Sequence, residues 1–166
     1  VIGIGGGASV EATDICENRG LSVPPLPKKV VAELRTFTPL AGSSVRNPVD
    51  TIEAWNPPEF AKTIELVGSC PTIDCMIIHL SVESAINRQG GKELFDQIVN
   101  VLLTTGKNVG KLMAVVFRST GTEDGFSIIN DAHKVCLNGR IPVFPSVERA
   151  ALAISRFVGY HELQFP

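Results

Sequence analysis

Short apolar runs alternate with amphipathic stretches along the 166 residues of this chain. The runs at residues 1–4, 75–80, 112–117 and 142–144 are short and nearly continuous, which is typical of buried strands. A helical period of apolar positions predicts helices at residues 8–19, 28–37, 59–67, 92–104, 125–137 and 147–158. Strands that alternate with helices form a mostly parallel sheet with helices on both faces. We therefore predict one three-layer α/β domain over residues 1–166.

One stretch departs from this alternation. Residues 40–58 contain few periodic apolar positions and many turn formers, among them Gly42, Asn47-Pro48 and Pro57-Pro58. We predict a long ordered loop here, and such loops are functional more often than not.

Composition excludes several classes of protein. The chain is 44% hydrophobic and 19% charged, and no apolar run reaches the roughly 20 residues that span a bilayer. The net charge of −2, with scattered basic residues and few aromatic ones, argues against binding of nucleic acid. The spacing of the four cysteines and of His133 and His161 gives no metal site and no disulfide framework, which favours reduced thiols in a cytoplasmic protein.

The chain begins directly in the first predicted strand. Val1 is not preceded by a methionine, a signal peptide or a leading loop. We therefore expect the chain to be part of a longer polypeptide.

The strongest local signal for chemistry is Gly5-Gly6-Gly7-Ala8-Ser9, between the first strand and the first helix. Without side chains, backbone N–H groups can approach a ligand, and the start of a helix favours negative charge, so this turn predicts a phosphate site. The alternative is purely structural: the glycines make a tight turn and Ser9 caps the helix. A dinucleotide fingerprint fits less well, because no acidic residue follows at the expected distance.

Two further places could contribute. In the long loop, Arg46 precedes Asn47-Pro48-Val49-Asp50; a guanidinium offers paired hydrogen bonds to phosphate, whereas Asn47 and Asp50 could merely close a turn. His79 ends a predicted strand at the edge where ligands bind in a doubly wound sheet. Since no Asp or Cys accompanies it at a recognisable spacing, we interpret His79 as a packed or solvated residue.

The order of these motifs resembles that of the NDP-forming acyl-CoA synthetases, relatives of succinyl-CoA synthetase. The resemblance rests on the glycine-rich turn, Asp14, Gly20-Leu21 and the Asn47 to Asp50 motif, and it covers most of the chain. The chain is specifically similar to the second of two flavodoxin-like domains in that family. It therefore implies a flavodoxin-like fold.

The resemblance also implies a reaction class for the complete protein. The family interconverts an acyl-CoA with an acid and coenzyme A, coupled to ATP/ADP or GTP/GDP with Mg²⁺, through an acyl phosphate and a phosphohistidine. The histidine resides in another domain, so no catalytic residue and no cofactor is expected here. Gly5, Gly6, Gly7, Ala8 and Ser9 would direct a helix N-terminus toward the phosphoryl group. The implied partners are the CoA-binding, phosphohistidine and ATP-grasp domains.

Two departures from the family accompany the resemblance. This chain lacks those three partner domains, so alone it is not expected to catalyse the reaction, and Ser9 occupies a position where many relatives have glycine. A regulatory or binding module of the same fold, for example one fused to an acyltransferase, is the first alternative. An independent flavin- or nucleotide-binding protein is the second, although the sequence lacks an aromatic-rich loop that would hold a flavin.

Overall fold

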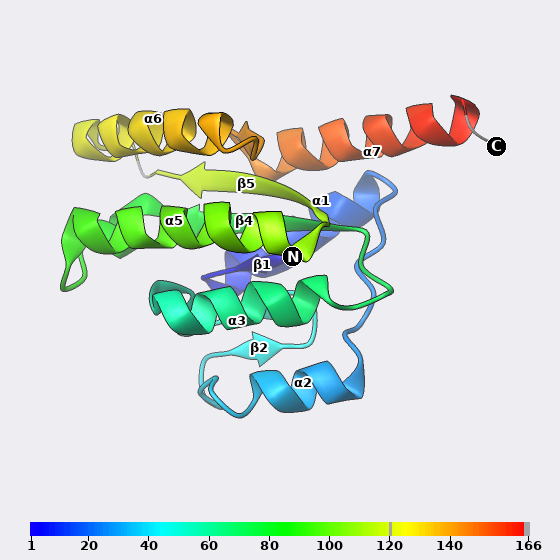
Figure 1. The fold of residues 1–166 in the computed structure, drawn as a ribbon, viewed down its shortest axis with the longest axis horizontal. Helices are drawn as coiled ribbons and strands as arrows, with labels where there is room; N and C mark the ends of the chain where they lie inside the picture. The colour runs from blue at the N-terminus through cyan, green and yellow to red at the C-terminus, as the bar shows by residue number, and fades with distance from the viewer. Residues whose placement is uncertain (120, 165–166) are drawn as a thin grey trace.

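A six-stranded sheet forms the centre of the computed structural model, which describes residues 1–119 and 121–164 (Figure 1). The strand order is β2-β3-β1-β4-β5-β6, and only β2 runs antiparallel to its neighbour. The predicted α/β class and mostly parallel sheet are thus confirmed. The strands are β1 (Ile2–Gly3), β2 (Ser44–Val45), β3 (Val49–Asp50), β4 (Cys75–Ser81), β5 (Leu112–Arg118) and β6 (Val143–Phe144).

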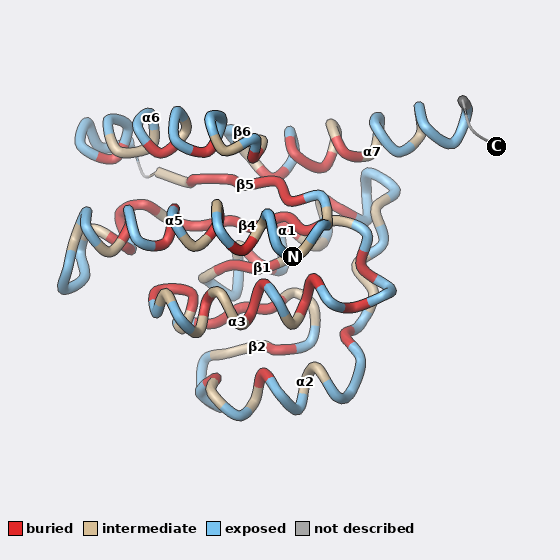
Figure 2. Tube along the Cα trace, in the orientation of Figure 1, coloured by how far each residue is buried: buried red, intermediate tan, exposed pale blue. Residues whose placement is uncertain are grey.

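Helices cover both faces of the sheet. On one face α1 (Gly6–Asn18) packs beside α7 (Val147–Gln164), and the other face carries α3 (Pro57–Gly68), α5 (Gly91–Val109) and α6 (Glu123–Asn138). The short α2 (Lys28–Leu34) lies beyond α3, and α4 (Val82–Ile86) follows β4 directly. The central strands are buried almost throughout, as Figure 2 shows.

Successive side chains of β4 point to opposite faces of the sheet and contribute to two separate hydrophobic cores. Met76, Ile78 and Leu80 belong to the larger core under α3 and α5, whereas Ile77 belongs to the smaller core under α1 and α7. On α5, Phe95, Ile98 and Leu102 are fully buried at helical spacing, as the periodicity predicts. Burial of such side chains contributes about 1.5–3 kcal/mol each, and these two cores fix the positions of the strand ends.

The stretch predicted as a long loop is partly regular, so that prediction was wrong. Residues 40–58 include β2, β3 and the 3-10 helix η1 (Ile52–Trp55). The backbone N–H groups of Val49 and Thr51 donate to the carbonyls of Val1 and Gly3, which adds β3 to the sheet. β2 and β3 each contain one apolar residue beside turn formers, so neither stands out as an apolar run, which is why the pattern gave no signal.

Several boundaries also differ. The first helix begins at Gly6 instead of residue 8, because two glycines form its first turn. The second helix ends at Leu34 instead of residue 37, α7 continues to Gln164, and α4 was not predicted. Among the described residues, no helix combines the length and apolarity needed to cross a bilayer.

Candidate anion-binding site

The candidate site lies where the strand order reverses. The chain leaves β1 to form β3 on one side of it, and then returns across the other face to form β4 on the other side. In doubly wound sheets, ligands bind at the carboxyl ends of the strands beside this switch point. Here those ends carry the glycine-rich turn after β1, Asp50 at the end of β3 and Arg118 at the end of β5.

The glycine-rich turn exposes the start of α1. Gly5 is the N-cap with a φ of 101°, a left-handed conformation that favours glycine, and its carbonyl accepts the first helical hydrogen bond from Ser9 N at 2.9 Å. Among the described residues, the backbone N–H groups of Gly6, Gly7 and Ala8 have no hydrogen-bond partner. No acidic residue occupies the first turn of α1, so the positive end of the helix dipole remains available to an anion.

Asp50 fixes this turn to the sheet. Its Oδ1 accepts a hydrogen bond from Gly5 N at 2.8 Å, and only 9% of the residue is exposed. Burial raises the pKa of the Asp50 carboxyl, and the hydrogen bond from Gly5 opposes that rise. The motif that contains Asp50 thus contacts the glycine-rich turn directly.

Arg118 holds the other side of the turn. Its Nη2 donates to the carbonyl of Ile4 at 3.0 Å, while its buried Nε has no partner among the described residues. Burial lowers the pKa of Arg118, yet a guanidinium keeps its charge in proteins. With a carboxylate on the β3 side and a guanidinium on the β5 side, an anion is favoured on the side of Arg118. Our sequence analysis missed this residue, although its place at the end of an apolar strand was a usable signal.

Ser9 and His79 form a buried pair beneath the turn. The Ser9 Oγ and the His79 Nε2 are 3.3 Å apart, and both residues are essentially inaccessible. Ser9 therefore does not cap the helix, because Gly5 holds the cap position and the Ser9 side chain contacts His79. Burial and then the charge of Arg118 lower the pKa of His79 to about 4, so its imidazole is neutral at pH 7. Its complete burial fits the interpretation of His79 as a packed residue.

The structure separates the other loop residues from this site. Asn47 lies at the amino ends of β1 and β3, where its Oδ1 accepts from Val1 N at 3.0 Å and its Nδ2 donates to the Pro24 carbonyl at 2.8 Å. Arg46 is exposed in the turn between β2 and β3. Asp50 alone of these three residues meets the glycine-rich turn.

Glu83 ties the neighbouring segments together. Its carboxylate accepts hydrogen bonds from the hydroxyls of Ser119 and, at 3.2 Å, Thr122, which is the N-cap of α6. This contact holds α4 against the start of α6 at the same edge of the sheet. In the described residues, no three His, Cys, Asp or Glu side chains are grouped so that they could hold a metal ion, and all four cysteines are free.

Together, the doubly wound sheet and the open helix start at its switch point define an α/β domain with a candidate anion-binding site. Comparison with known protein families identifies the family to which this domain belongs. The chain belongs to the Ligase-CoA domain family, whose model matches residues 1–148.

Individual proteins also resemble this chain in sequence or fold. The chain is 35% identical over 72 residues to the alpha subunit of an ADP-forming acetate–CoA ligase II of Pyrococcus furiosus, which is 43% of this chain and 16% of that protein. A solved protein of Pyrococcus horikoshii OT3 matches 97% of the chain with a TM-score of 0.77 and 24% identity, over 35% of its own length. A dinucleotide-forming acetyl-coenzyme A synthetase 1 of Ca. Korarchaeum cryptofilum, solved with phosphate and ADP, matches 97% with a TM-score of 0.74 and 21% identity, over 32% of its length. The chain thus spans about a third or less of these relatives.

Proposed function

We propose that this chain is a domain of an ADP-forming acyl-CoA synthetase, in which the start of α1 stabilises a phosphoryl group. The complete enzyme would interconvert acyl-CoA, nucleoside diphosphate and phosphate with the free acid, coenzyme A and nucleoside triphosphate. The family membership and the curated relative support the reaction class. Coenzyme A, nucleotide and Mg²⁺ would be bound by other domains, and we expect the enzyme to be cytoplasmic.

The observation that carries the proposal is the open start of α1 beside a charged guanidinium. Three backbone N–H groups at Gly6, Gly7 and Ala8 are free of protein partners, and Arg118 is anchored at the preceding carbonyl. Donors that are fixed before the ligand arrives need no reorganisation, so they stabilise charge on a transferring phosphoryl group effectively. The chain would contribute this electrostatic stabilisation, and the phosphorylated histidine would come from another domain.

A substitution at Gly7 tests this role. A Cβ at Gly7 would have no heavy atom within 4 Å, so Gly7→Asp fits the fold, and an acidic residue in the first turn stabilises a helix by about 0.3–1 kcal/mol. We expect Gly7→Asp to keep or raise the melting temperature and yet to abolish phosphoenzyme formation by the full-length protein, because its carboxylate repels the phosphoryl group.

The matched control is Gly7→Asn, which has the same size without the charge. It is expected to retain phosphoenzyme formation, as measured with radiolabelled nucleoside triphosphate. Equal phosphoenzyme in the Asp and Asn variants would refute a role for this helix start. A regulatory module would form no phosphoenzyme even in the unsubstituted full-length protein, so that measurement separates the two functions.

We further propose that the distal half of α7 docks another domain of the same enzyme. This half extends beyond the sheet in Figure 1 and exposes Phe157, Tyr160 and Leu163, the last of which is 83% exposed. Next to it, Phe157, Phe144 and Leu112 help to line an apolar groove of about 210 Å³ along the edge of the sheet. Contiguous exposed apolar surface of this kind is typical of interfaces, and the relatives contain a much longer chain that could cover it.

Hydrogen exchange in the full-length protein tests this docking surface. We expect the backbone amides of residues 157–163 to exchange at least tenfold more slowly than those of the short helix α2, since a docked domain suppresses local opening. Exchange at equal rates in the two segments would show that α7 is not covered.

A further inference from the structure

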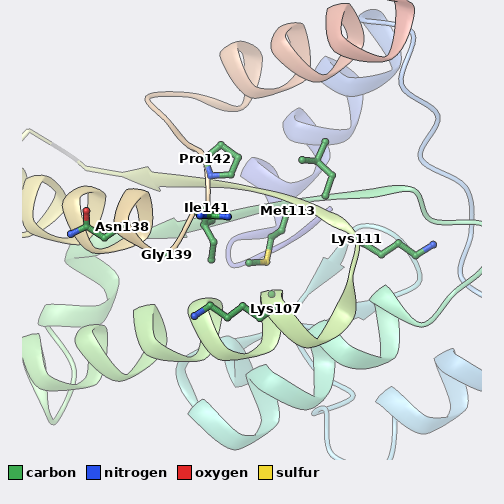
Figure 3. A pocket seen from close by; sticks show the side chains of 10 residues that line it. Lys107, Lys111, Met113, Asn138, Gly139, Ile141 and Pro142 are labelled. Carbon is green, nitrogen blue, oxygen red and sulfur yellow. The ribbon is translucent and has the colours of Figure 1, made fainter. Parts of the chain in front are cut away.

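A second cavity lies at the opposite edge of the sheet from the glycine-rich turn. It has a volume of about 530 Å³ and lies between the ends of α5 and α6 and the starts of β5 and β6 (Figure 3). Its size falls in the range of small-molecule sites. Close packing at two glycines forms its walls: a Cβ at Gly106 would stand 2.6 Å from Met113 Cε, and one at Gly139 would stand 2.2 Å from Leu103 Cδ2.

Three basic residues line this cavity, namely Lys107, Lys111 and Arg140. Lys107 and Arg140 are both exposed, and among residues 1–119 and 121–164 neither side chain has an ion-pair or hydrogen-bond partner. Figure 3 shows Lys107 extending toward the end of α6 near Asn138, whereas Lys111 extends away on the other side. The lining residues include no carboxylate, so the side chains that line the cavity carry a net positive charge.

The backbone of Arg140 makes this arrangement unusual. Its φ of 62° is left-handed, and it is the one described non-glycine residue with a positive φ. It occupies the position after α6 where Ile141 N bonds back to the Cys136 carbonyl at 2.9 Å, a helix end that favours glycine. A cation near a helix C-terminus interacts favourably with the helix dipole, but this interaction is available without a strained backbone. The left-handed conformation of Arg140 instead accompanies the position of its guanidinium on the cavity wall.

We propose that this cavity binds a small organic phosphate. The phosphate dianion would lie beside Lys107 and Arg140, and the carbon skeleton would lie against Met113, Ile141 and Pro142. Two cations match the charge of a phosphate dianion better than the single charge of a carboxylate, and the apolar wall favours an organic ester over inorganic phosphate. This site does not depend on the proposed function of the glycine-rich turn.

Titration of the full-length protein with phenyl phosphate, followed by the amide NMR shifts of Gly106 and Gly139, tests the proposal. We expect saturable shifts, and an affinity at least tenfold higher than that of inorganic phosphate at the same amides. Arg140→Gly and Lys107→Gln are each expected to weaken binding about tenfold, the typical effect of one lost charge-assisted hydrogen bond. Arg140→Gly relieves the strained conformation, so its melting temperature should not fall.

The matched control is Lys29→Gln, which removes an exposed positive charge on α2, a helix that does not line the cavity. It is expected to leave the affinity within twofold of the unsubstituted protein. The proposal is overturned if phenyl phosphate shifts neither amide, if Arg140→Gly binds as tightly as the unsubstituted protein, or if inorganic phosphate binds equally well.

Discussion

Between pH 7 and pH 4, the free energy of unfolding is expected to fall by about 3 kcal/mol more in the unsubstituted protein than in a His79→Gln variant. Burial, and then the charge of Arg118, lower the pKa of His79 from 6.5 to about 4 in the folded state. Each pH unit between these two values corresponds to about 1.4 kcal/mol. The folded protein therefore resists a proton that the unfolded chain accepts readily.

The sign follows from where the proton binds. Above pH 6.5, His79 is neutral in both states and the stability is fully present. As the pH falls toward 4, the unfolded chain binds a proton at this position that the folded protein does not bind, so stability is lost across that window. Below about pH 4 the folded state also binds it and the loss stops growing.

Urea unfolding at several pH values between 7 and 4 measures this effect. Glutamine can keep a hydrogen bond to Ser9 without titrating, so the His79→Gln variant reports the loss that comes from all other groups, Asp50 included. Parallel curves for the two proteins would mean that His79 is protonated at its ordinary pKa and that the packing around it is looser than the structure indicates.

The sequence predicts the layers of this fold well, because long elements carry a strong period. Helix α5 has 19 residues and strands β4 and β5 have seven each, so the apolar pattern of each element is distinct from chance. The two-residue strands β2 and β3 have no such pattern. They exist because the hydrogen bonds from Val49 and Thr51 complete the edge of β1, which is a tertiary effect that no local window contains.

The candidate site was likewise predicted only where its signal is local in the sequence. The glycine-rich turn was recognisable as a candidate, since consecutive glycines between a strand and a helix allow backbone N–H groups to approach an anion. The roles of Asp50 and Arg118 depend on contacts 45 and 114 residues apart along the chain, with Gly5 and Ile4 respectively. The Ser9–His79 contact spans 70 residues, so Ser9 was open to interpretation as a cap until the fold placed His79 beneath it.

These long-range contacts couple the position of the glycine-rich turn to the packing of the residues beneath it. Asp50 from β3, Arg118 from β5 and His79 from β4 all contact residues within or next to the first turn of α1. A change at any of the three strands is therefore expected to alter the position of the unpartnered N–H groups at the start of α1. Stability measurements on variants of His79 and its neighbours thus also report on the packing beneath the glycine-rich turn.

Gly3 packs directly against the His79 ring. Gly3→Ala is therefore expected to lower the free energy of unfolding by about 3 kcal/mol, toward the upper end of overpacking effects. A Cβ at Gly3 would stand 2.3 Å from both Cε1 and Nε2 of His79, so the ring must move. It has little room to do so, because His79 is fully buried, Ser9 lies against it and β1 pairs with β4 at this position.

The double variant Gly3→Ala/His79→Ala removes the ring that the new methyl group meets. We expect it to be more stable, by about 2 kcal/mol, than the sum of the two single effects predicts, which is the coupling typical of residues in direct contact. Chemical denaturation of the four proteins completes the cycle. Additive effects would mean that Gly3→Ala acts through the backbone of β1 and not through the imidazole, and the close packing of His79 on Gly3 would then have to be abandoned as the reason for glycine at this position.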